Sequence, residues 1–224
     1  MSAGLFITGT DTGVGKTYVT AALLAELRRR GVRAAAFKPV ACGTGGRHDA
    51  EIYAGIMNHE QPIELINPVY LRHPLAPGVA ARLERRRIDL RRIRDCYQRL
   101  SSAYSVVLVE GAGGLLVPIR DDYFVADLAK SLGLPLLVVG RLGLGTINHS
   151  LLTVRAAQDM GLKVRGLVLN DTVGGKRGLA ATTNIETVPE LCRIPLLGVM
   201  PHGKHGMRAA ARQICDRLFG RQPD

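Results

Sequence analysis

The residues with the clearest chemical potential lie near the N-terminus, where positions 9–17 read Gly-Thr-Asp-Thr-Gly-Val-Gly-Lys-Thr directly after an apolar run. A strand, a glycine-rich turn and a helix in this order are typical of a phosphate-binding loop. Backbone N–H groups of such a turn converge on phosphate oxygens, and the helix start adds partial positive charge. Lys16 would contact the outer phosphates and Thr17 would offer a hydroxyl to Mg²⁺. A strict form of the pattern has glycine at position 10, where this chain has Thr10.

Other polar residues follow the next apolar runs, and ligands of parallel α/β sheets bind at the carboxyl ends of strands. Lys38 follows the run 34–37, and Glu110 follows the run 106–109. A carboxylate at the end of a buried strand is the usual position for holding metal or water in phosphate-loop enzymes. Asp49 begins a predicted helix, where it is either a helix cap or a carboxylate that reaches Mg²⁺.

Two later segments could also meet a ligand at this edge. Residues 143–148 form a glycine-rich loop that opens a helix, which is a second potential anion site. Asn170 and Asp171 follow another apolar run, and Asn170 is either a simple turn residue or a donor and acceptor for a base edge.

The pattern along the chain predicts the elements that position these residues. Helical spacing favours helices over 16–30, after Asp89, and from Thr146 or Asn148 to Met160. Residues 60–80 hold four prolines and indicate a structured loop excursion. Short apolar runs without alternation predict buried parallel strands at 5–7, 34–37, 106–109, 136–139, 167–169 and 196–199. The alternation predicts a three-layer α/β phosphate-loop NTPase fold with a mainly parallel central sheet.

Length and composition fit one domain over residues 1–224, because 46% of the residues are hydrophobic and mean hydropathy is +0.09. No run approaches the roughly 18 apolar residues of a membrane span, and no secretion signal is evident. The four cysteines have no C-x-x-C or zinc spacing, which favours a reducing cytoplasm.

The net charge of +11 raises the possibility of an anionic partner. Much of the excess arginine lies in residues 82–99, which offer no aromatic stacking platform. A solvated helix face is the favoured interpretation, with weak attraction of anions such as ATP as the alternative. We therefore predict neither a nucleic-acid partner nor a membrane partner.

Taken together, the motifs resemble the dethiobiotin synthetase family in order and spacing from residue 5 to about residue 201. The matching elements are the phosphate loop at 8–17, K-P-V at 38–40, E-G-A-G-G at 110–114, L-G-T-I-N-H at 144–149 and N-D at 170–171. The phosphate loop alone is shared by many ATPases, whereas the five elements together are specific.

The resemblance implies an enzyme that uses ATP, Mg²⁺ and CO₂ to close a cyclic urea on 7,8-diaminopelargonic acid, the penultimate step of biotin synthesis. A substrate amine captures CO₂ as a carbamate, which attacks the γ-phosphate to give a carbamic–phosphoric anhydride. The second amine then closes the ring. The resemblance also implies a homodimer in which the partner subunit completes the substrate site.

The same resemblance assigns residues to this site. It makes Lys38 and Lys16 catalytic and gives Mg²⁺ the ligands Thr17, Asp49 and Glu110. It places the substrate against Thr12, Lys38, Cys42, Thr146, Ile147 and Asn148. It places the nucleotide against Gly13, Val14, Gly15, Lys16, Thr17, Tyr18, Asp49, Glu110, Gly111, Ala112, Gly113, Asn170, Asp171, Met200, Pro201 and His202.

Three other classes of protein share this type of loop. Amidoligases related to cobyrinic acid diamide synthases carry a glutaminase domain, for which 224 residues leave no room. Partitioning ATPases of the ParA and MinD type need an extra lysine where this chain has Asp11. A regulatory nucleotide-binding domain without turnover is disfavoured only by Lys38 and the E-G-A-G-G element.

Overall fold

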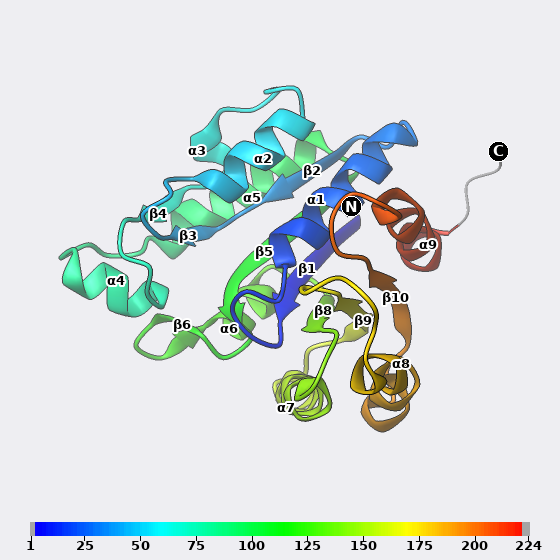
Figure 1. Cartoon of the computed structure of the whole chain (residues 1–224). Helices are drawn as coiled ribbons and strands as arrows, with labels where there is room; N and C mark the ends of the chain where they lie inside the picture. The colour runs from blue at the N-terminus through cyan, green and yellow to red at the C-terminus, as the bar shows by residue number, and fades with distance from the viewer. Residues whose placement is uncertain (1–2, 221–224) are drawn as a thin grey trace.

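The computed structural model describes residues 3–220 and has a parallel six-stranded sheet at its centre (Figure 1). The strand order is β10-β9-β8-β1-β5-β2. These strands are β1 (Ala3–Gly9), β2 (Ala34–Phe37), β5 (Val106–Gly114), β8 (Leu136–Arg141), β9 (Val164–Asn170) and β10 (Leu196–Met200). All six predicted strands therefore occur in one sheet, and the predicted fold class is confirmed.

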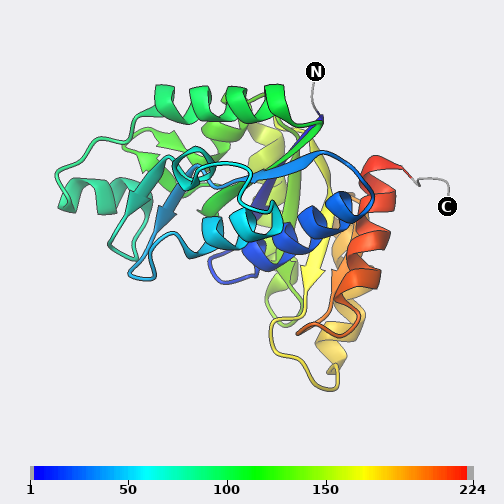
Figure 2. The same cartoon turned by 90° about the horizontal axis from the view of Figure 1, so that it is seen from above.

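Helices cover both faces of the sheet, as Figure 2 shows for α5 on one face and α1 with α9 on the other. A second apolar cluster joins β8 and β9 to α7 and α8 through Val138, Val154, Leu167 and Val188. The helices are α1 (Lys16–Arg29), α2 (His48–Ile56), α3 (Ile63–Ile66), α4 (Pro77–Leu83), α5 (Leu90–Ala103), α6 (Val125–Ser131), α7 (Thr146–Asp159), α8 (Leu179–Cys192) and α9 (Met207–Phe219). Within residues 3–220, none of these helices is both long and apolar enough to cross a membrane.

Local signals explain the helix boundaries that the sequence predicted. Asp89 caps α5 by accepting hydrogen bonds from the N–H groups of Arg91 and Arg92 at 2.9 and 3.2 Å. After α1, Gly31 adopts a φ of 74°, a left-handed conformation that ends helices with little strain in glycine. The arginines of residues 82–99 are all exposed, as expected for a solvated face.

The prediction that residues 60–80 form a loop excursion is wrong, because the segment contains regular secondary structure. It contains α3, the short strand β4 (Val69–Leu71) and the start of α4, and β4 pairs in parallel with β3 (Val40–Cys42). A two-stranded antiparallel pair, β6 (Pro118–Arg120) and β7 (Tyr123–Phe124), lies beyond the end of β5. Prolines favoured a loop in the prediction, but Pro62 directly precedes α3 and Pro77 is the first residue of α4. At the start of a helix the missing N–H of proline costs no hydrogen bond.

Strand register decides which functional residues become neighbours. Phe37 pairs with Val109, so Lys38 and Glu110 come next on adjacent strands. Ile7 pairs with Glu110, which sets this carboxylate beside the start of the phosphate loop. The prediction that β5 ends before Glu110 is wrong, since the strand continues to Gly114 and stays paired with Gly9.

Candidate active site

The phosphate loop connects β1 to α1 and leaves the start of that helix open. Gly13 and Gly15 have positive φ values of 74° and 89°. No side chain caps Gly15, and the first turn of α1 contains no acidic residue. Backbone N–H groups and the helix dipole therefore face the adjoining cavity without a competing negative side chain, as an anion site requires.

Lys16 extends from the first turn of α1 into this loop. Its ammonium donates to the carbonyl oxygen of Asp11 at 3.2 Å, and the residue is 7% exposed. Burial lowers the pKa of Lys16 to about 8, with Glu110 opposing the shift and Lys38 adding to it. The negative charge of a bound phosphate would stabilise the ammonium form of Lys16 and raise its pKa again.

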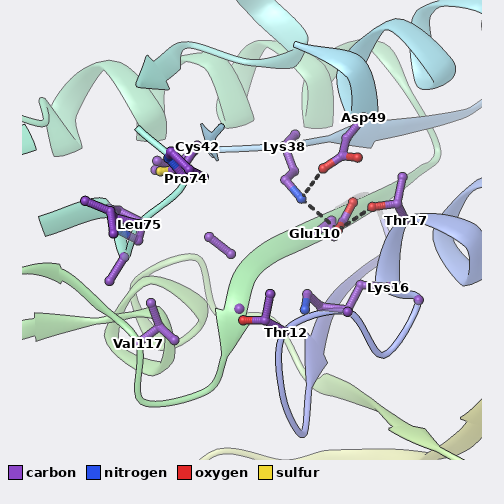
Figure 3. A pocket seen from close by; sticks show the side chains of 17 residues that line it. Thr12, Lys16, Thr17, Lys38, Cys42, Asp49, Pro74, Leu75, Glu110 and Val117 are labelled. Carbon is purple, nitrogen blue, oxygen red and sulfur yellow. Dashed lines mark hydrogen bonds and ion pairs between the residues drawn. The ribbon is translucent and has the colours of Figure 1, made fainter. Parts of the chain in front are cut away.

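Lys38 is at the centre of a buried ionic cluster (Figure 3). Its Nζ atom lies 2.7 Å from Oε1 of Glu110 and 2.7 Å from Oδ2 of Asp49. The hydroxyl of Thr17 donates to the same Oε1 of Glu110 at 3.0 Å. The other oxygen of Glu110, Oε2, accepts a hydrogen bond from Tyr53.

The charges of this cluster stabilise one another. Burial alone would lower the pKa of Lys38, but Glu110 and Asp49 outweigh it and the pKa is raised. Burial would raise the pKa of Asp49, but the charge and hydrogen bond of Lys38, with Thr17, lower it. Lys38 is therefore an ammonium and Asp49 a carboxylate at neutral pH.

Residues 66 and 67, in the segment predicted as a loop excursion, hold the backbone of Lys38 in place. The Lys38 N–H donates to the Ile66 carbonyl at 2.8 Å, and the Asn67 amide donates to the Lys38 carbonyl at 2.7 Å. Asn67 is fully buried and also bonds the Val69 carbonyl at 3.0 Å. No local motif marks Asn67 in the sequence, because its role depends on contacts 29 residues away.

A cavity of about 660 Å³ adjoins the loop and the cluster, a size usual for small-molecule sites. One end carries Lys16, Thr17, Lys38, Asp49 and Glu110, while the other is mostly apolar (Figure 3). The sequence analysis missed most of this apolar end, whose lining residues are Val40, Pro74, Leu75, Ala76, Pro77 and Val117. The prolines of residues 60–80 were the sequence signal that could have indicated the part of this wall formed by Pro74 and Pro77.

Most of the predicted substrate and phosphate residues do line this cavity. Besides the ionic residues they are Thr12, Gly13, Gly15, Cys42, Ala112 and Gly113. Burial raises the pKa of the Cys42 thiol to about 11, which keeps it protonated and unreactive at neutral pH. Val14 and Gly111 are buried behind the lining, and a side chain at Gly111 would meet Phe6 and Val125 at 2.9 Å.

The residues predicted to surround a base gather beside the phosphate loop. The Asn170 amide donates to the Val14 carbonyl at 2.9 Å, and the Tyr18 hydroxyl donates to the Pro201 carbonyl at 3.1 Å. The Asp171 N–H donates to the Met200 carbonyl at 2.9 Å, and exposed His202 follows Pro201. Among the described residues, Oδ1 of buried Asn170 has no hydrogen-bond partner. The structure thus brings these residues together beside the phosphate loop.

The predicted substrate residues at the start of α7 behave differently. Thr146, Ile147 and Asn148 do not line this cavity. Thr146 is buried, Ile147 is half-buried and Asn148 is exposed. Within one chain, these three residues therefore do not share a cavity with Lys38 and Glu110.

The fold and the open phosphate loop define the chain as a phosphate-loop NTPase of the α/β class. Solved structures agree: MinD from Pyrococcus horikoshii, complexed with Mg-ADP, matches with a TM-score of 0.64 over 98% of this chain and 96% of that one. A ParA family ATPase from Chlorobium tepidum matches with a TM-score of 0.58 over 99% and 95%. Their identities of 16% and 11% support a shared fold alone.

Sequence comparison narrows the class. Residues 3–209 match a family described as "AAA domain". ATP-dependent dethiobiotin synthetase BioD of Thermodesulfovibrio yellowstonii is 39% identical over 90% of each chain. The protein of that name from Methanocaldococcus jannaschii is 40% identical over 88% of this chain and 92% of its own, and that of Anaeromyxobacter sp. (strain K) is 50% identical over 75% and 77%. The chain belongs to the ATP-dependent dethiobiotin synthetase family, a family of ligases.

Proposed function

We propose that the protein joins CO₂ to the two amines of 7,8-diaminopelargonic acid with ATP, forming dethiobiotin for biotin synthesis. The observation that carries this proposal is the ammonium of Lys38, held by Asp49 and Glu110 at the polar end of a half-apolar cavity. A substrate with reacting amines at one end and an alkyl chain behind them matches this division. The alkyl chain would bury apolar surface against Leu75 and Val117.

The proposed reaction has three steps. One amine forms a bond to the carbon of CO₂ and loses a proton, which gives a carbamate. A carbamate oxygen then attacks the γ-phosphorus of ATP, and ADP leaves with the electron pair of the broken P–O bond. The second amine attacks the carbamate carbon, loses a proton and expels phosphate, which closes the urea ring.

Lys38 and Lys16 have separate roles in this scheme. The carbamate and the transferring phosphoryl group are both anionic, so fixed cations beside them lower the barrier. Lys38 would neutralise the negative charge of the carbamate. Lys16, in the phosphate loop, would stabilise the negative charge of the γ-phosphate during its transfer. Water must be kept from the anhydride during its lifetime, because water would hydrolyse it before the ring closes.

The oxygen donors of the site fit a magnesium ion. The carboxylates of Asp49 and Glu110 contact Lys38, and the hydroxyl of Thr17 contacts Glu110. All three side chains offer hard oxygen ligands of the type that Mg²⁺ prefers. Bound there with ATP, the ion would offset charge on the β- and γ-phosphates. The buried Oδ1 of Asn170 has no hydrogen-bond partner within residues 3–220, and it would accept a hydrogen bond from the amino group of an adenine bound beside Met200, Pro201 and His202.

The start of α7 suits the substrate's distal carboxylate. Gly145 precedes it with a φ of 89° and no side-chain cap, and exposed Asn148 lies in the first turn. Because these residues lie outside the cavity of their own chain, we propose that the partner subunit of a homodimer supplies them. Four free cysteines suit a protein of the reducing cytoplasm, where we expect it to act.

The first test is the dependence of ATP cleavage on both other substrates. We expect phosphate release only when diamine and bicarbonate are present, because the carbamate is the attacking nucleophile. Dethiobiotin should appear in equal amount by mass spectrometry. Rapid ATP hydrolysis without the diamine would contradict the proposal and favour a partitioning-type ATPase.

The second test mixes two inactive variants to ask whether the site is shared. Lys16→Ala removes the phosphate contact, and Asn148→Trp blocks the α7 start. A shared site predicts that mixed dimers regain activity, up to about half of the wild-type turnover per heterodimer. One of the two sites then has both lesions and the other has neither. Lack of recovery after proven subunit exchange would locate the whole site in one chain.

A further inference from the structure

The carboxylate of Glu110 has its two oxygens engaged by different groups. Oε1 accepts from Lys38 at 2.7 Å and from Thr17 at 3.0 Å, and it faces the cavity side of the cluster. Oε2 accepts from the hydroxyl of Tyr53 on the opposite side. Glu110 is 1% exposed, so water cannot readily replace a lost donor.

Helix α2 delivers Tyr53 to this position. Tyr53 follows Asp49 by four residues, and side chains at this spacing lie on one helical face. The ring is completely buried, and small Ala50 and Ala54 on the same helix are also buried. Since α2 packs against α1 and β2, the same helix brings Asp49 to Lys38 and Tyr53 to Glu110.

We propose that Tyr53 is a positioning residue that fixes the rotation of the Glu110 carboxylate, so that Oε1 faces Thr17 and Lys38. The proposal rests on the function proposed above, in which Glu110 acts beside the phosphates. Tyr53 belongs to none of the motifs in the sequence and does not line the cavity.

The physical reason is that a terminal carboxylate torsion is broad and roughly two-fold. Lys38 and Thr17 both bond Oε1 of Glu110, so they do not fix the position of Oε2. The phenol holds the second oxygen and removes that freedom. It also satisfies a buried acceptor that would otherwise lose its only hydrogen-bond donor among the described residues.

The test is Tyr53→Phe, which removes one oxygen atom and keeps the buried ring. We expect kcat for dethiobiotin formation to fall about 10- to 100-fold, the usual effect of losing a group that orients a ligating residue, with little change in the KM for the diamine. A second readout needs no turnover. Binding of a non-hydrolysable ATP analogue should respond to Mg²⁺ about 10-fold less than in the wild type, with unchanged affinity in EDTA.

Tyr104→Phe is the matched control. Tyr104 is 4% exposed and its hydroxyl donates to Glu60 at 3.0 Å, away from the cavity. Tyr53→Phe loses the hydrogen bond to Glu110, whereas Tyr104→Phe loses the bond to Glu60 and the one that its hydroxyl accepts from Gln61 at 3.3 Å. Thermal unfolding measures the structural cost of each change. The proposal is overturned if Tyr53→Phe loses stability but keeps the wild-type kcat and the wild-type response to Mg²⁺.

A double-mutant cycle with Glu110→Gln tests whether Tyr53 acts through Glu110. In the Glu110→Gln background, adding Tyr53→Phe should change the Mg²⁺ response less than about two-fold, because contacting residues are not additive. Full additivity would refute a positioning role. If the wild-type protein makes no dethiobiotin, the proposed function fails, but the nucleotide-binding arm still decides the role of Tyr53.

Discussion

Replacing Lys38 by alanine is expected to lower kcat for dethiobiotin formation by roughly 10²–10³-fold, the usual cost of losing one charge-stabilising group. ATP affinity should change far less. Lys38 projects from the end of β2 toward Asp49 and Glu110, on the side of the cavity that continues to the apolar wall. In the proposed mechanism, its charge would act where the carbamate forms. Steady-state kinetics and equilibrium binding of an ATP analogue separate the two effects.

Stability has to be followed in the same experiment. Removing one partner from a fully buried ion pair costs about 3–5 kcal/mol. The cost should be smaller here because the Asp49 side chain is 30% exposed. Lys130→Ala is a suitable control, since Lys130 is exposed and, within residues 3–220, its side chain bonds only the Met160 carbonyl, at 3.2 Å. An unchanged kcat would remove Lys38 from the mechanism, and an equal loss of ATP affinity would make it a nucleotide-binding residue.

Replacing Gly15 by alanine is expected to abolish most ATP binding. A methyl group there would lie 2.0 Å from the amide nitrogen of Asn170, which bonds the Val14 carbonyl. The residue also has a φ of 89°, a conformation strained for alanine. If the loop relieves the clash and strain by leaving its anion-binding conformation, restoring that conformation on binding ATP would cost about 1–3 kcal/mol, which corresponds to a loss of up to roughly 100-fold in affinity. Isothermal titration with ATP measures it.

Gly31→Ala separates strain from the clash. Gly31 follows the other end of α1 with a φ of 74°, and nothing lies within 4 Å of a methyl group there. We expect both variants to lose stability, by about 1–2 kcal/mol from the backbone conformation alone. Only Gly15→Ala should lose nucleotide affinity. Equal ATP binding by the two variants would show that Asn170 moves aside at little cost.

The ligands of Asn148 in α7 and of Asn170 at the end of β9 stay predictions. The sequence predicts Asn148 at a helix start and Asn170 at the end of a strand, and the structure confirms both positions. The proposed contact of Asn148 requires a second subunit, and the proposed contact of Asn170 requires a bound nucleotide. The mixing experiment and nucleotide titrations address these two cases separately.

The sequence by itself determined the fold class, the six strands of the central sheet and the phosphate loop. These features depend on short-range rules: continuous apolar runs for strands buried on both faces, and glycines where φ is positive. Gly13, Gly15, Lys16 and Thr17 could be assigned from nine consecutive residues, because the backbone of one turn carries the chemistry.

Only the tertiary structure decided which side chains complete the site. Lys38 and Glu110 are 72 residues apart and become partners through the register of β2 on β5. Tyr53 and Asn67 carry no local signal, because their value depends on a buried acceptor that another element presents. A hydrogen bond or ion pair between distant elements is fixed by how those elements pack, and periodicity along the chain cannot specify it.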